Sequence, residues 1–255
     1  MPNEEVYAHP TVTQVIFQIR FPNLFNIASR IGDLQIKIMN RFPESKLLQS
    51  RSILIADLGP DAKLGDIPEP PQTPGVQTIW QFLSPEGVKL DITTSTLSLS
   101  SKQHKTYHVA GAEPQFRETI EFTVTRFLDV LQLPLLTRIG LRYIDHCSLP
   151  PNLTNAAFSA YYLTTFPLDR FPISDALEMS FVTCIRRRGH FLRFSESLNT
   201  RSQPPKYILD FDGYAENTKS DAFLSTTDSL HDLIHTEYEA FIKDPVRTYM
   251  RKPEA

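Results

Sequence analysis

Apolar and polar residues alternate with a period of two in several short segments of the chain. In the segment 13–21, Val15, Phe17 and Ile19 alternate with Gln14 and Gln18, which predicts a half-buried strand. Comparable apolar or alternating segments predict further strands at 52–58, 77–83, 88–93, 97–99, 137–145, 177–185, 191–195 and 206–212. The pattern therefore predicts a chain rich in antiparallel strands.

Apolar residues recur at helical spacing in four other segments. This spacing predicts helices at 24–38, 113–131, 156–163 and 228–243. Pro134 ends the second of these helices, and the pattern then starts again. Each half thus follows the order strand, helix, several antiparallel strands and a long helix, which indicates an internal duplication by pattern alone.

We expect an α+β fold in which two β-α-β-β(-β)-α halves form an antiparallel sheet with the long helices packed on one face. The halves cover about 10–133 and 134–245 of a single domain, 1–255. The segment 59–75 is predicted to be a Pro-rich loop, and 245–255 a tail. Two separate small domains are the alternative arrangement.

Composition narrows the class of protein. Hydrophobic residues make up 41% and charged residues 22%, as in an ordinary globular protein. Nine Gly against 20 Pro disfavours Gly-rich phosphate loops, and a net charge of -3 disfavours a globally basic nucleic-acid binder. The two cysteines cannot form a disulfide framework or a structural zinc site. Without a signal-peptide pattern after Met1 or an apolar run of about 20 residues, we expect a cytoplasmic protein with no membrane partner.

The segment 138–145 is the most distinctive candidate for ligand binding. Arg138 and Arg142 share one strand face with the small Gly140, so two guanidiniums stand near each other and are suited to bind a carboxylate or phosphate. The structural alternative is that each arginine pairs across the sheet with a carboxylate from Asp210, Asp212 or Glu178.

Asp210, Asp212 and His231 form a second candidate set. Two carboxylates on one strand face, with a histidine from the last helix, suit a metal-dependent hydrolase or nuclease. His231 and His235 also have the i, i+4 spacing of metal ligands. The alternatives are a solvated strand face and a buried histidine in the packed stripe. No cofactor is expected. Asp145, His146 and Cys147 suggest a cysteine nucleophile with its partners, but these three side chains cannot converge, because adjacent strand residues point to opposite faces.

A cluster of arginines occupies a predicted hairpin tip. Arg186, Arg187 and Arg188, together with Arg193, predict contact with an acidic partner or ligand. Phe191 and Phe194 lie close by, which leaves nucleic-acid binding open although it is not favoured. A solvated charged turn is the structural alternative.

Several of these segments, in order along the chain, resemble a family of uncharacterised prokaryotic proteins of similar length and sporadic distribution. The segments are 12–22 (VTQVIFQIRFP), 80–87 (WQFLSPEG), 138–145 (RIGLRYID), 209–212 (LDFD), and Leu230-His231 with Phe241. This chain departs from the family pattern at Gln14 and Gln18, where acidic residues are common, and at Asp145, where Asn is usual. The resemblance lends no catalytic residues, and its patchy distribution implies an accessory of a defence or toxin–antitoxin system.

Three hypotheses follow. The first, which the sequence favours, is a non-enzymatic binding or interaction protein, since no convergent catalytic set or catalytic motif is recognisable. The second is a sensor of a small anionic ligand or nucleotide, with Arg138, Arg142, Asp210 and His231 at the site. The third is the metal-dependent hydrolase built on Asp210, Asp212 and His231.

Overall fold

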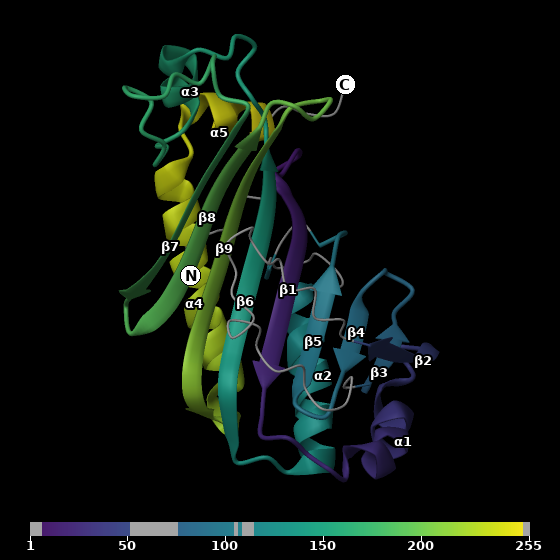
Figure 1. The fold of residues 1–255 in the computed structure, drawn as a ribbon. Helices are drawn as coiled ribbons and strands as arrows, with labels where there is room; N and C mark the ends of the chain where they lie inside the picture. The colour runs from purple at the N-terminus through teal and green to yellow at the C-terminus, as the bar shows by residue number, and fades with distance from the viewer. Residues whose placement is uncertain (1–6, 52–75, 105–106, 109–114, 252–255) are drawn as a thin grey trace, which may run out of the picture.

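The computed structural model describes residues 7–51, 76–104, 107–108 and 115–251. The strand predicted at 52–58 and the Pro-rich loop at 59–75 lie outside these ranges. The described part is built on one sheet, shown in Figure 1.

Nine antiparallel strands form this sheet in the order β2-β3-β4-β5-β1-β6-β9-β8-β7. Their bounds are β1 Val12–Arg20, β2 Glu44–Arg51, β3 Val76–Leu83, β4 Lys89–Ile92, β5 Thr96–Ser101, β6 Leu135–Cys147, β7 Glu178–Arg187, β8 His190–Asn199 and β9 Lys206–Lys219. The mixed α+β class and the antiparallel sheet are therefore confirmed, and the sheet is continuous from one half of the chain to the other.

Strands β1 and β6 join the two halves at the centre of the sheet. Phe17 of β1 lies opposite Leu99 of β5 on one side and Leu141 of β6 on the other. All three side chains are fully buried. Apolar residues in register across neighbouring strands pack into one face, so the seam between the halves is part of the core.

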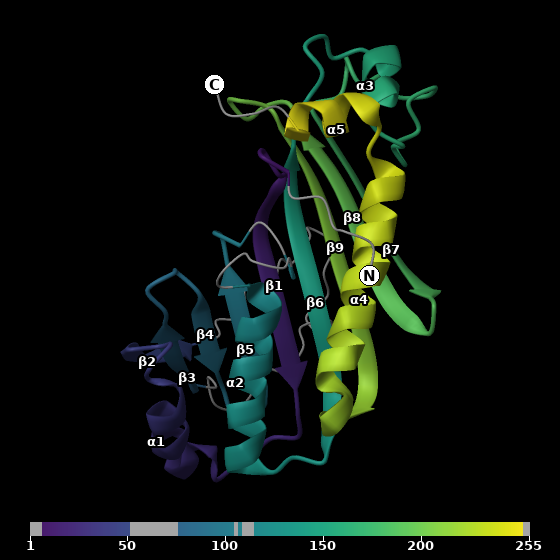
Figure 2. The same ribbon diagram turned by 180° about the vertical axis from the view of Figure 1, so that it is seen from behind.

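The helices are α1 (Ile27–Ile38), α2 (Phe116–Leu131), α3 (Asn155–Tyr161), α4 (Phe223–Phe241) and α5 (Asp244–Arg251), with a short 3-10 turn at Ser220–Ala222. Figures 1 and 2 show α2 and α4 on the same side of the sheet. Their stripes of buried residues, such as Ile120 in α2 and Leu230 in α4, cover the apolar sheet face. We call the opposite sheet face the open face, because none of the described helices covers it.

Two sequence predictions need correction. The expected tail at 245–255 contains helix α5, whose Val246 and Met250 are buried. A helix can form here because these apolar residues fall four apart on one side of it. The sequence pattern also does not predict strand β2, because the adjacent Leu47 and Leu48 interrupt the period of two.

None of the described helices is long and apolar enough to cross a membrane.

Candidate binding site

Both arginines of the distinctive segment lie on the open face, and each holds an aspartate of β9. Arg142 donates from Nε to Oδ1 of Asp210 at 2.7 Å and from Nη2 to Oδ2 at 2.5 Å. Arg138 donates from Nη2 to both carboxylate oxygens of Asp212, at 2.8 and 2.9 Å. The hydrogen bonds that Arg142 makes to Asp210 raise the pKa of this guanidinium above its usual value. The cross-strand pairing is thus the observed arrangement.

Gly140 provides the space that Arg138 occupies. A Cβ at Gly140 would lie 2.4 Å from Nη1 of Arg138, so the guanidinium crosses directly over the glycine. Its Cζ also lies 4.6 Å from the centre of the Tyr214 ring, within cation–π distance. A cavity of about 180 Å³ remains beside these groups. An anion entering it would compete with the carboxylate of Asp212 for Arg138.

His231 lies on the other side of the sheet, which corrects the predicted site. It is buried on α4, where its Nδ1 is 3.0 Å from the Tyr143 hydroxyl and its ring stacks on Tyr107 at 4.1 Å. Asp210 pairs with Arg142 on the open face, so the sheet separates it from His231. Within the described residues, no three His, Cys, Asp or Glu side chains gather where they could hold a metal ion.

Near His231, an ion pair connects the two long helices α2 and α4. Asp228 of α4 accepts hydrogen bonds from Nε and Nη2 of Arg117 on α2, at 2.8 and 2.9 Å, and from the Tyr107 hydroxyl at 2.8 Å. Burial and the nearby Asp228 raise the pKa of Tyr107 far above its usual value, so this phenol stays protonated. A bidentate pair between two helices fixes their relative position. No local sequence pattern indicates this pair, because its members are more than a hundred residues apart.

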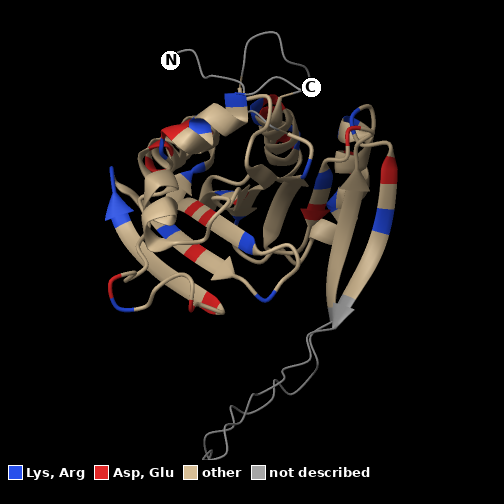
Figure 3. Ribbon diagram, turned by 90° about the horizontal axis from the view of Figure 1, so that it is seen from above, with Lys and Arg blue, Asp and Glu red and all other residues tan. Residues whose placement is uncertain are grey.

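The arginine cluster is divided between two faces. Arg186 and Arg193 lie on the open face, where Arg186 sits over the Phe191 ring at 5.7 Å. Arg187 forms an ion pair with Glu237 of α4, and Nη1 of Arg188 lies 3.5 Å from a hydroxyl of the same helix. Successive strand residues point to opposite faces, so the four cations do not form one patch. Figure 3 shows basic and acidic segments interspersed on the strands.

Asp145 is a buried carboxylate on the helix side of the sheet. It accepts a hydrogen bond from Thr11 at 2.8 Å, and its burial raises its pKa to about 7. Burial also raises the pKa of the neighbouring Cys147 thiol, which disfavours a thiolate nucleophile. His146 is exposed on the opposite face. The three side chains therefore do not share one face, as the alternation of strand residues predicts.

Glu196 of β8 is fully buried and holds the loop between α3 and β7, which spans residues 162–177 (the α3–β7 loop). Its carboxylate accepts from Thr164 Oγ1 at 2.5 Å, from the Thr165 amide at 2.9 Å and from the Thr165 hydroxyl. The Tyr207 hydroxyl donates to it at 2.8 Å. These donors satisfy the buried carboxylate and fix the start of the loop on the sheet.

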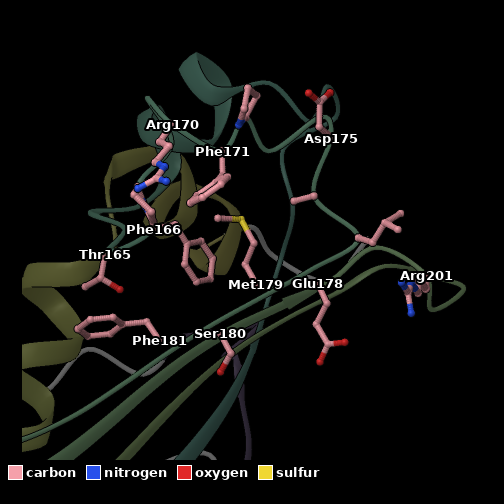
Figure 4. A pocket seen from close by; sticks show the side chains of 14 residues that line it. Thr165, Phe166, Arg170, Phe171, Asp175, Glu178, Met179, Ser180, Phe181 and Arg201 are labelled. Carbon is pink, nitrogen blue, oxygen red and sulfur yellow. The ribbon is translucent and has the colours of Figure 1, made fainter.

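The α3–β7 loop and the first half of β7 form the walls of a cavity of about 710 Å³ that is open to solvent, which we call the edge cavity. Figure 4 shows Phe166, Phe171, Met179 and Phe181 gathered beneath the loop. The charged residues that also line it are Arg170, Asp175, Glu178 and Arg201. Its volume and mostly apolar lining are those of a ligand pocket. The sequence signal for it is the repeated Phe-Pro pair at 166–167 and 171–172, which no strand or helix pattern explains.

The edge cavity adjoins a strand with one free side. In the described sheet, β7 is the last strand and pairs with β8. No backbone hydrogen bond from any described residue reaches its outer side. Phe181 and Val182 are 37% and 51% exposed although both are apolar. Unpaired main-chain groups beside an apolar cavity are the two elements that an extended peptide needs for binding.

Comparisons with models of protein families, with curated proteins and with solved structures give no match. The function is therefore inferred from the geometry of the described residues.

Proposed function

We propose that this protein is a non-enzymatic binding protein that holds an extended polypeptide segment along β7, with one of its apolar side chains in the edge cavity. The observation that carries the proposal is the free side of β7 next to that cavity. An added strand gains affinity from main-chain hydrogen bonds and specificity from pockets for alternate side chains. The edge cavity supplies such a pocket through Phe171 and Met179.

The composition of β7 supports this role. Seven uncharged residues, 179–185, separate Glu178 from Arg186, and none of them is proline or glycine. Proteins usually protect a free edge with lysine, proline or a bulge, because an unprotected edge pairs with other chains. Arg186 and Arg193 lie on the open face next to this edge, where we propose that they contact acidic residues of the bound segment.

The other two hypotheses have weaker support. A sensor of a small anion would have to free Arg138 and Arg142 from Asp212 and Asp210 before binding. A metal-dependent hydrolase would need His231 to join those aspartates through the sheet. The binding protein needs no such rearrangement.

We further propose that the two halves arose by duplication. Support comes from the topology: β1 and β6 are central neighbours, and each pairs with the last strand of its own half, β5 or β9. A location in the cytoplasm, membership of the resembled prokaryotic family and a role beside defence or toxin–antitoxin systems stay predictions.

A displayed library of random heptapeptides, selected on sparsely immobilised protein, tests the binding proposal. We expect enriched peptides with alternating apolar residues. Phe171→Asp should weaken their binding at least about tenfold, because it places a charge in the apolar cavity. Phe25→Asp is the matched control, since Phe25 is 93% exposed and belongs to the other half.

Two outcomes would overturn the proposal. One is a selection that enriches no peptide. The other is a set of peptides that bind Phe171→Asp as tightly as the unmodified protein.

A further inference from the structure

The charges of β7 are arranged so that the strand is complementary to itself. Glu178 stands at its start and Arg186 near its end, an even number of residues apart. Residues with this spacing on a strand point to the same face, so both side chains lie on the open face. Glu178 forms no ion pair within the described residues. Two antiparallel copies of β7 would therefore bring opposite charges together at both ends.

We infer that the polypeptide that pairs with β7 is a second copy of this chain, related by a two-fold axis at Val182. The two nine-stranded sheets then form one continuous sheet. The inference rests on the proposed use of β7 as a pairing edge and names its partner. An interface about a two-fold axis uses the same patch on both copies, which is what a self-complementary strand provides.

The register follows from which side chains share a face. On the open face, Val182 lies opposite the partner's Val182, Glu178 opposite the partner's Arg186, and Ser180 opposite the partner's Cys184. On the helix side, Met179 lies opposite the partner's Ile185 and Phe181 opposite the partner's Thr183. A shift of one residue would turn the second copy over, so that its helices lay on the side of the first copy's open face; the inferred two-fold axis excludes such registers.

The second copy also extends the edge cavity. Met179 and Phe181 line the cavity on the helix side. In the inferred register they meet the partner's Ile185 and the partner's Thr183, which cover their exposed sides. Phe181 and Val182 are then buried in the assembly, which explains why apolar side chains occupy an edge strand.

The other edge of the sheet lacks this complementarity. Strand β2 carries Lys46 next to Leu47, which is 63% exposed. A lysine on an edge strand opposes pairing with another chain, because its charge must be desolvated. We therefore expect β2 to remain unpaired between copies and the assembly to stop at a dimer.

Charge reversal tests the inferred dimer. We expect a dimer at about 50 µM protein in sedimentation equilibrium, and Glu178→Arg or Arg186→Glu alone should weaken it at least about tenfold by placing like charges opposite each other. Mixing the two single variants should restore a dimer, because at one end of the interface the arginine introduced at 178 then meets the glutamate introduced at 186. The double variant E178R/R186E should also dimerise, because both end pairs are then of opposite charge.

Cross-linking tests the register itself. Cys184 is exposed, so Ser180→Cys should form two intermolecular disulfides with the partner's Cys184 under mild oxidation. In a Cys184→Ser background, Thr183→Cys is the matched control and should stay uncross-linked, because Thr183 faces the partner's Phe181.

A monomeric unmodified protein at the same concentration, or a dimer unaffected by Glu178→Arg, would overturn the inference. So would a mixture of the two single variants that stays monomeric. If the chain is monomeric while heptapeptides still bind in a Phe171-dependent way, the dimer fails and the peptide-binding function stands. If no peptide binds and no dimer forms, both fail.

Discussion

The two halves of the chain differ in where their carboxylates lie. In the N-terminal half, strands β4 and β5 bury Leu90, Ile92, Leu97 and Leu99 completely and show no buried carboxylate among the described residues. In the C-terminal half, Asp145 and Glu196 are both buried, and Arg138 and Arg142 are paired with aspartates on the open face. A buried carboxylate costs free energy unless it is fully hydrogen-bonded, so Asp145 and Glu196 mark places in the C-terminal half where the surrounding chain must be held in position.

The two edge strands of the described sheet, β2 and β7, also differ in charge. Strand β2 carries a protective lysine, whereas β7 has seven uncharged residues in a row and adjoins the edge cavity. Glu196 fixes the loop that forms one wall of this cavity. Glu196 thus holds the loop beside the surface for which we propose a binding role, and substitutions in the two halves test how much the polar groups of each half contribute to stability.

Glu196→Ala should have the largest effect. It leaves the buried Tyr207 hydroxyl and the part-buried donors of Thr164 and Thr165 without an acceptor, so we expect the free energy of unfolding to fall by about 4 kcal/mol. Urea denaturation measures the change. Glu216→Ala, at an exposed position on β9, is the control and should change it by less than about 0.5 kcal/mol. Equal effects of the two substitutions would contradict a fixing role for Glu196.

Asp145→Asn should remove a pH dependence of stability. The folded-state pKa of Asp145 is raised to about 7 from an ordinary 3.8, so between these values the folded protein binds a proton that the unfolded chain has released. Stability contributed by this group is therefore lost as the pH rises, by roughly 2–3 kcal/mol between about pH 5 and about pH 8. Denaturation at both pH values measures the loss, and the Asn variant should show a flatter profile.

The matched control for this pH profile is Asp91→Asn in the N-terminal half. Asp91 is partly exposed and pairs with Lys89 on the sheet surface. Its replacement should leave the profile of the unmodified protein intact. If Asp145→Asn leaves the profile unchanged as well, the buried carboxyl is not the titrating group.

Gly140→Ala and Gly32→Ala should have small effects of opposite sign. The first places a methyl group where the Arg138 guanidinium lies, so the pair with Asp212 breaks and stability falls by about 1 kcal/mol. The second adds a methyl group in helix α1 with nothing within 4 Å, and alanine in a helix is favoured over glycine by up to about 1 kcal/mol. Thermal unfolding of both variants measures the difference; a stabilised Gly140→Ala would exclude close packing of Arg138 over the glycine.

Much of the fold can be predicted because its signals are local. Alternation in 137–145 and 206–212 identifies β6 and β9, and helical spacing identifies the long helices. The predicted start of β9 is correct, but the predicted end at 212 is too early, because Gly213 and Asn217 are residue types typical of turns. The strand continues to Lys219. Gly213 instead gives room to Ile234 and Leu230 of α4, a close approach that no local pattern reveals.

Local patterns were enough to establish the α+β class, the antiparallel strands and the option that Arg138 and Arg142 pair with aspartates of β9. The packing of the whole chain was needed to show that His231 lies across the sheet from those pairs and that Glu196 fixes the loop over the edge cavity. The physical reason is that a strand's alternation fixes which residues share a face, whereas the neighbours of that face depend on the order of all nine strands.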